Sequence, residues 1–112
     1  MIVARIAAWG EVPVALTGDF NTLKDFGVYK TFVEAGLRDA YRQLHAPGRV
    51  MEGTFHDFGR VPPMPIDWIF VSPQFQVVEA EIDRTHVGPL YPSDHYPITA
   101  TLSFPKNSTP PH

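Results

Sequence analysis

Val14-Ala15-Leu16-Thr17-Gly18-Asp19-Phe20-Asn21 is a short apolar run that leads directly into an acidic and an amide side chain. The apolar residues after Pro13 predict a buried strand, and Gly18 marks a point where the backbone can turn. Ligands in open α/β sheets gather beyond the carboxyl ends of strands, so Asp19 and Asn21 are candidate site residues. The alternative is that this pair only forms an Asx turn that caps a following helix.

Four further segments have the composition or alternation of strands, at 53–58, 66–72, 76–84 and 96–104. The strongest is Ile66-Asp67-Trp68-Ile69-Phe70-Val71-Ser72, which is rich in β-branched and aromatic residues but carries a carboxylate near its start. Helices are expected over 1–9 and 24–35, the second capped by Thr22 or Asp25 and ended by Gly36, while 37–44 is a helical turn or an extended link. The pattern predicts an α+β fold, with one mixed, mainly antiparallel sheet of about five strands and one or two helices on a face.

The Ile66 to Val71 run is apolar on both faces, and strands of that kind are normally covered twice. We therefore expect a second layer, supplied by a partner copy in a homo-oligomer or by a missing N-terminal half. Residues 1–104 form a single partial domain, and the Ser-, Asn- and Pro-rich tail over 105–112 is expected to be frayed.

Composition limits the classes of protein that the chain can represent. With 112 residues, 44% hydrophobic and 19% charged, it is one ordinary globular domain. The net charge of −3 does not favour long duplex nucleic acid as a partner. Cysteine is absent, which excludes disulfides and thiolate metal sites and suits a cytoplasmic chain. No stretch has the length and apolarity of a membrane span, and none resembles a signal peptide.

The polar residues at strand ends together suggest a functional site. Ser93-Asp94-His95 precedes the last strand, and an imidazole there can act as an acid, a base or a donor to phosphate. Asp67 can supply the carboxylate that fixes the tautomer of His95, although it could instead be a structural acid paired with Arg60 or Arg84. The oxygens of Asp94, Asp19 and Asn21 are the ligands that Mg²⁺ (or Mn²⁺) prefers.

Three motifs, in this order, resemble the C-terminal motifs of the endonuclease/exonuclease/phosphatase family: GDFN at 18–21, IDWIFVS at 66–72 and YPSDHYPI at 91–98. That family includes deoxyribonuclease I, abasic-site endonucleases, sphingomyelinases and inositol-polyphosphate 5-phosphatases. The segment GTFHDFG at 53–59 also resembles the TFHG segment of a bacterial branch. The resemblance implies half of the four-layer α/β sandwich of the deoxyribonuclease I-like fold and a Mg²⁺-dependent phosphoester hydrolase.

By that resemblance, Asp19 would orient or deprotonate the attacking water, and Asn21 would hold a phosphate oxygen or a metal-bound group. Asp94 would bind or support the metal together with Asp19 and Asn21. His95 would contact the scissile phosphate, with Asp67 fixing its ring. His56 is either a further substrate contact or a histidine that hydrogen-bonds inside the sheet.

The family's N-terminal motifs, which include its principal metal ligand, do not occur in this sequence. We therefore expect a fragment, a truncated gene product or an assembly of two copies, with weak or no activity in isolation. The alternative function is a non-catalytic module that self-associates or binds a partner through its open sheet face. A phosphate patch of four arginines is a weaker possibility than a solvated face: Arg38, Arg42, Arg49 and Arg60.

Overall fold

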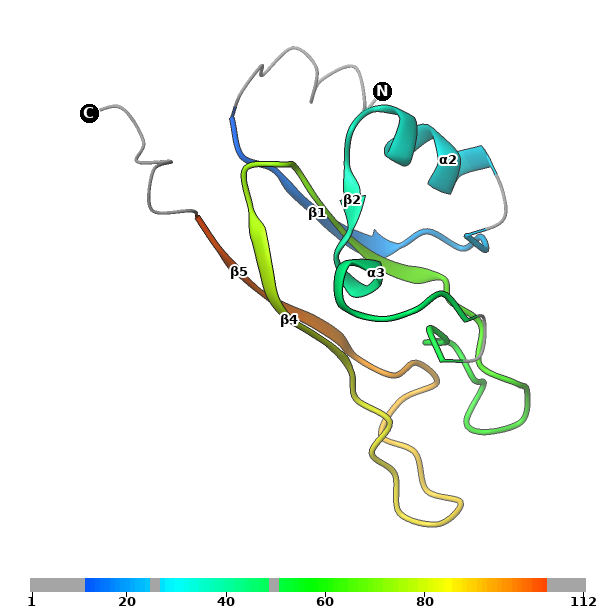
Figure 1. Ribbon diagram of the computed structural model, residues 1–112. Coiled ribbons are helices and arrows are strands. Elements are labelled where there is room, and N and C mark those ends of the chain that lie inside the picture. Colours follow the sequence, from blue (N-terminus) through cyan, green and yellow to red (C-terminus); the bar gives the residue numbers. More distant parts are fainter. Residues whose placement is uncertain (1–11, 25–26, 49–50, 105–112) are drawn as a thin grey trace.

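The structure, a computed structural model, describes residues 12–24, 27–48 and 51–104. The expected helix over 1–9 and the tail over 105–112 lie outside these ranges. In chain order the elements are β1 (Ala15–Asp19), α2 (Gly27–Glu34), β2 (Arg38–Asp39), α3 (Ala40–Leu44), β3 (Asp67–Val71), β4 (Gln76–Ile82) and β5 (Ile98–Ser103) (Figure 1). The antiparallel α+β class is confirmed.

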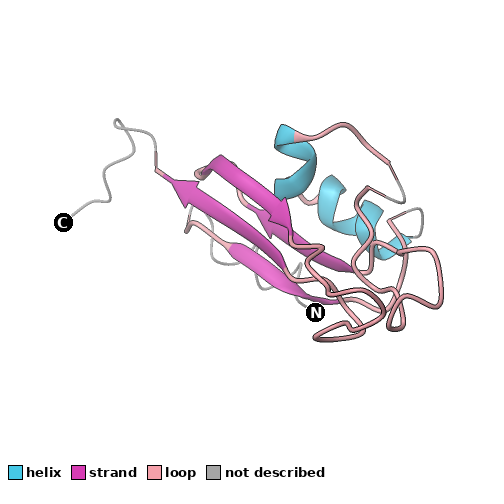
Figure 2. Cartoon of the chain, turned by 90° about the horizontal axis from the view of Figure 1, so that it is seen from below, coloured by secondary structure: helices cyan, strands magenta, loops and turns pink. Residues whose placement is uncertain are grey.

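The strands form two hydrogen-bonded groups rather than the single sheet expected. One has the order β1-β3-β2 and the other is the β4-β5 pair, and every pairing is antiparallel. The expected strand over 53–58 is reduced to isolated bridges from Phe55 to Met64 and to His95. The fifth strand is instead β2, whose two residues are too few to form a recognisable sequence pattern. The long loops gather at one end of the strands (Figure 2).

One face of β3 packs against α2 through aromatic rings. Trp68 and Phe70 are fully buried, and they pack with Tyr29 and Phe32 of the helix. The ring centroids of Tyr29 and Trp68 lie 5.2 Å apart in an edge-to-face arrangement, a geometry that adds to simple burial. The aromatic content that identified β3 in the sequence therefore forms the main core.

The opposite face of β3 is also covered by this chain. Ile69 and Val71 are buried with Ala40, and partly buried residues of the β4–β5 region pack against them: Phe75, Val77, Ile98, Ala100 and Leu102. The two-sided apolar pattern was correctly interpreted as a strand covered twice. However, the second layer at β3 comes from the chain's own hairpin, so this pattern alone does not require an outside partner.

The helix ends follow local signals. Gly36 ends the second helical segment with φ +91°, and Leu37 N–H donates back to the carbonyl of Phe32. The described helix covers 27–34 within the expected 24–35, and Asp25 lies outside the described residues. The 37–44 segment contains both alternatives, a short extended piece and then α3, whose N-terminus is capped by the Asp39 carboxylate.

Candidate active site

Asp19 and Asn21 lie where β1 ends. Asp19 Oδ1 accepts a hydrogen bond of 2.9 Å from the Asn21 N–H, and Asn21 adopts φ +51°. The Asx turn that was the alternative interpretation is therefore present. It uses one carboxylate oxygen only. Asp19 Oδ2 lies 3.9 Å from His95 Nε2, so the same side chain shapes the turn and faces the candidate site.

Asp67 and His95 form the central contact of the site. Asp67 Oδ2 lies 2.6 Å from His95 Nδ1, with the two side chains 17% and 26% exposed. Because a carboxylate can only accept, His95 Nδ1–H donates, and this fixes the ring so that Nε2 faces the other acidic groups. The two arginines that the sequence offered as partners of Asp67 bind elsewhere: Arg60 pairs with Asp57, and Arg84 donates to the Met51 carbonyl.

Thr54 and Phe55, which were not among the candidate site residues, hold Asp67 and His95 in place. Thr54 Oγ1 accepts from the backbone N–H of Asp67 at 3.1 Å, and the Thr54 carbonyl accepts from Tyr96 N–H at 2.6 Å. The Phe55 ring meets the His95 ring edge-on, with centroids 5.1 Å apart. Thr54 is fully buried. Its role depends on contacts between distant segments, which no local pattern reveals.

The charges around His95 favour its protonated form. Burial by itself lowers the pKa of the imidazole, but the hydrogen bond and charge of Asp67, with the charges of Asp94 and Asp19, raise that pKa above its ordinary value by more. Asp19 and Asp67 are also direct cross-strand partners in the β1–β3 pair. Like charges placed opposite each other repel, and a cationic ring between them relieves that repulsion.

An open cleft of about 390 Å³ lies beside the His95 ring, lined by Asn21, Thr22, Leu23, Phe55, Met64, Ile66 and His95. Its walls are largely apolar. Among the described residues the lining holds neither Lys nor Arg, and its polar side chains are those of Asn21, Thr22 and His95.

The donor set fits a hard divalent cation. Single ligand atoms of Asp19, Asp67 and His95 lie within 4.8 Å of one another, and Asp94 Oδ1 is 4.0 Å from His95 Nε2. Asp67 Oδ2 is bound by the His95 ring, and the oxygens of Asp19 and Asp94, with the Asn21 amide, are the further candidate ligands beside it. Carboxylate and amide oxygens are the ligands that Mg²⁺ and Mn²⁺ prefer.

His56 lies behind the site rather than in the cleft. Its side chain is 1% exposed, its Nδ1 accepts from Gly59 N–H at 3.1 Å, and its ring packs 4.1 Å from the ring of Tyr96. Burial lowers the pKa of His56, so the ring is held neutral. Its backbone N–H donates to the Asp94 carbonyl. This environment favours the structural interpretation of His56 over a direct substrate contact.

Two further histidines, His45 and His86, and Arg42 have contacts outside the cluster. His45 donates to the Ala80 carbonyl, and His86 stacks on a tyrosine in the exposed loop. Arg42 is engaged by Glu52, which agrees poorly with the alternative of a phosphate patch of four arginines. Arg49 lies outside the described residues.

In the described parts of the chain, no helix is long and apolar enough to cross a membrane.

The family model of the Endonuclease/Exonuclease/phosphatase family matches residues 1–95 of the chain. The chain belongs to the endonuclease/exonuclease/phosphatase family. The motifs at Asp19, Asp67 and His95 all fall within the matched part. No curated protein matches the chain.

Solved structures of this family superimpose on most of the chain. An endonuclease/exonuclease/phosphatase from Bacteroides vulgatus is 36% identical, with a TM-score of 0.76, and the match covers 93% of this chain and 41% of that one. The mannosyl-6-phosphatase of Bacteroides thetaiotaomicron is 29% identical, with a TM-score of 0.71 and coverages of 92% and 43%. The chain therefore spans about two-fifths of the length of these relatives, and it shares their deoxyribonuclease I-like fold.

Proposed function

We propose that the chain carries the Asp67–His95 half of the active site of a Mg²⁺- or Mn²⁺-dependent phosphoester hydrolase. The single observation that supports this most strongly is the cluster in which His95 bridges Asp67 and Asp19 at the mouth of the cleft. A hydrolase in the broad sense agrees with the family and with the phosphatase among the similar structures.

The reaction replaces one phosphorus–oxygen bond with another. A water oxygen attacks phosphorus as the bond to the alcohol oxygen breaks, and negative charge grows on the phosphoryl oxygens. Asp19 Oδ2, the oxygen outside the Asx turn, orients the water and accepts its proton. Protonated His95 donates from Nε2 to a phosphoryl oxygen, while Asp67 holds the ring by Nδ1.

Asn21 completes the site by donating from its amide to another phosphate oxygen. Asp94 and Asp19, with the Asn21 carbonyl, would hold the divalent cation, which supplies Lewis-acid stabilisation of the developing charge when bound. The apolar cleft without Lys or Arg favours a small phosphorylated substrate over nucleic acid.

Hydrolysis of p-nitrophenyl phosphate and bis(p-nitrophenyl) phosphate tests this function. The chain is assayed with Mg²⁺ or Mn²⁺ and with EDTA, next to Asp19→Ala and His95→Ala. His86→Ala serves as the control, because it removes an exposed imidazole outside the cluster. Turnover of the isolated chain is expected to be weak, and EDTA and both site variants should abolish it while the control keeps it. Turnover that is unaffected by EDTA and by His95→Ala would refute the assignment.

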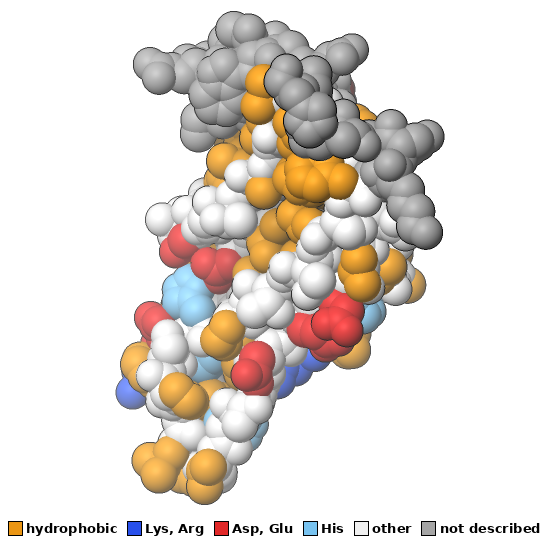
Figure 3. All heavy atoms as spheres, turned by 90° about the vertical axis from the view of Figure 1, so that its left-hand side faces the viewer, with side chains coloured by type: hydrophobic (Ala, Val, Ile, Leu, Met, Phe, Trp, Pro, Cys, Tyr) orange, Lys and Arg blue, Asp and Glu red, His pale blue; other side chains and the backbone are white. Residues whose placement is uncertain are grey.

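A second candidate is a module that binds a second copy or a covering N-terminal portion. Figure 3 shows hydrophobic side chains gathered in a band on one face, above the acidic and histidine side chains. Phe104 and Val78 are among the large hydrophobic residues that are about half exposed. Sedimentation separates the candidates, since a monomer at all concentrations contradicts self-association.

A further inference from the structure

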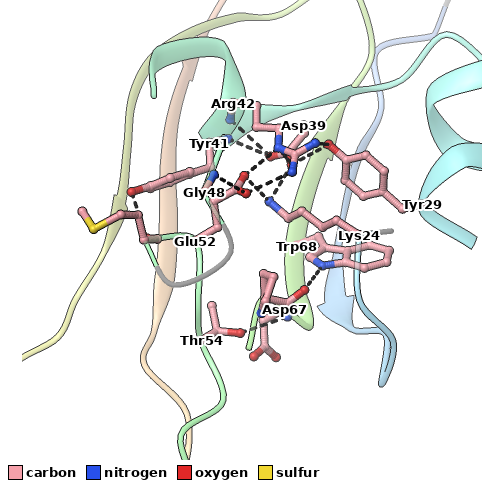
Figure 4. A network of polar contacts seen from close by, with 12 residues as sticks. Lys24, Tyr29, Asp39, Tyr41, Arg42, Gly48, Glu52, Thr54, Asp67 and Trp68 are labelled. Carbon is pink, nitrogen blue, oxygen red and sulfur yellow. Dashed lines mark hydrogen bonds and ion pairs between the residues drawn. The ribbon is translucent and has the colours of Figure 1, made fainter. Parts of the chain in front are cut away.

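A buried group of charged side chains lies behind the cleft and takes no direct part in the proposed chemistry. Lys24 Nζ is 2.7 Å from Asp39 Oδ2 and 2.9 Å from Glu52 Oε1, and these three side chains are between 1% and 3% exposed. Arg42 Nε binds Glu52 Oε1 at 2.7 Å, and Tyr29 donates to Asp39 at 2.9 Å. Figure 4 shows Lys24 reaching between the two acids.

The charges of this group are balanced within it, and its charged atoms already have partners in the chain. Two cations face two carboxylates, and the oxygens of Glu52 accept from Lys24, from Arg42 and from the backbone N–H of Gly48. A space of about 230 Å³ borders Lys24, Arg42 and Glu52, but each of these charged groups already has partners. The group therefore holds parts of this chain together and does not offer a binding site.

The two ends of the Lys24–Glu52 pair lie on segments that form opposite parts of the candidate active site. Lys24 directly follows Asn21, Thr22 and Leu23, which line the cleft after β1. Glu52 precedes Thr54 and Phe55, the residues that hold Asp67 and His95. In Figure 4 the Thr54–Asp67 contact is drawn below the charged group.

From this arrangement we propose that Lys24 and Glu52 are positioning residues for the hydrolase site. Their buried ion pair fixes the Asp19–Asn21 end of β1 relative to the Asp67–His95 pair, although neither side chain touches the cluster. The proposal rests on the proposed function, because the distance between Asp19 and His95 matters only if these groups act together. Small errors in the placement of reacting groups can lower rates by about 100-fold.

The first test is spectroscopic and does not need activity. At one fixed pH, the His95 ring Cε1–H signal and the Asn21 side-chain amide signals are recorded in the whole chain and in Lys24→Met. We expect both to move. The matched control is Lys30→Met, which breaks the exposed Lys30–Glu34 pair, with side chains 77% and 66% exposed. It should leave both signals in place.

A general loss of fold stability must be distinguished from a displacement of His95 and Asn21. Val71→Ala weakens the buried core at the far end of β3 from Asp67, and it should leave the His95 signal unchanged at a similar loss of stability. If Lys24→Met does not fold, the double variant Lys24→Met/Glu52→Gln keeps the group neutral. Lys24→Arg restores a cation, and it should return the His95 and Asn21 signals toward their original positions. Unmoved signals in a folded Lys24→Met, or in the double variant, overturn the proposal.

Kinetics give the second test. If the chain hydrolyses p-nitrophenyl phosphate, Lys24→Met should lower kcat by about 10-fold or more with a much smaller change in KM, because the groups that act on the transition state are displaced. Lys24→Arg should recover most of kcat. Equal kcat in a folded Lys24→Met refutes the positioning role. Turnover that EDTA and His95→Ala leave unchanged counts against the proposed function, and in a chain without turnover the spectroscopic test decides the positioning.

Discussion

Replacing Glu52 with Gln should destabilise the fold by about 3–5 kcal/mol, the usual effect of breaking a buried ion pair. Glu52 is 1% exposed, and its two oxygens accept from Lys24 at 2.9 Å, from Arg42 at 2.7 and 3.0 Å and from Gly48 N–H at 3.2 Å. A glutamine has one oxygen in place of two, so its NH₂ group must face N–H donors. Domains are stable by only about 5–15 kcal/mol, so the loss is a large fraction of the total.

The same contacts predict how stability depends on pH. Burial alone raises the pKa of Glu52, but hydrogen bonds from Arg42 and Lys24 and the charge of Lys24 lower it by more, so the net pKa lies below the ordinary 4.5. The unfolded chain therefore binds a proton more readily than the folded one. The stabilisation from Glu52 is present above the unfolded-state pKa and is lost as pH falls through the folded-state pKa.

Urea denaturation, followed by tryptophan fluorescence between pH 7 and pH 3, measures both effects. We expect Glu52→Gln to have a lower midpoint at pH 7 and a shallower decline with acidification than the original chain. Glu34→Gln removes a carboxylate that is 66% exposed and should change stability by about 0–1 kcal/mol. A Glu52→Gln variant as stable as the Glu34→Gln control, or one with an unchanged acid decline, refutes the reasoning.

Three further changes follow from the structure. Asp67→Asn should lower the raised pKa of His95, because the carboxylate that stabilises the imidazolium loses its charge; an NMR titration in which the pKa stays or rises contradicts this. Gly59→Ala should cost about 1–3 kcal/mol, since Gly59 has φ +82° and a Cβ there would lie 2.7 Å from the Tyr91 ring; an unchanged Tm contradicts it. Phe70→Ala should cost about 3–5 kcal/mol in urea denaturation, because it empties a fully buried ring site, and a loss below 1 kcal/mol contradicts that burial.

Much of the fold could be predicted because its signals are local. The β-branched and aromatic run at 67–71, the turn glycine at Gly36 and the apolar alternation at 98–102 all correspond to described elements. The prediction of a strand over 53–58 was wrong. The segment does alternate apolar and polar residues, but it lies beside loops, so its backbone pairs only at single bridges. The separation of the strands into two groups depends on long-range register, which periodicity does not contain.

For the candidate site too, the residues in local motifs could be predicted and the long-range contacts could not. The resemblance named Asp19, Asn21, Asp67, Asp94 and His95, and the structure brings the Asp19, Asp67, Asp94 and His95 side chains together. The supporting contacts could not be read from the sequence, because Lys24 resembles any exposed lysine before a helix. Its burial results from two acids that are 15 and 28 residues away. A lone lysine carries no pattern that predicts such partners.

The register of β3 against β1 sets both the core and the geometry of the candidate site. Asp67 of β3 pairs with Asp19, and Trp68 pairs with Gly18. Trp68 and Phe70 of the same strand fill the core. A slip of one residue would turn Trp68 and Phe70 toward the wrong face and would also separate Asp67 from Asp19. The strand pairing that buries the aromatic core therefore also places the two acids opposite each other, so a register error would disturb the core and the candidate site together.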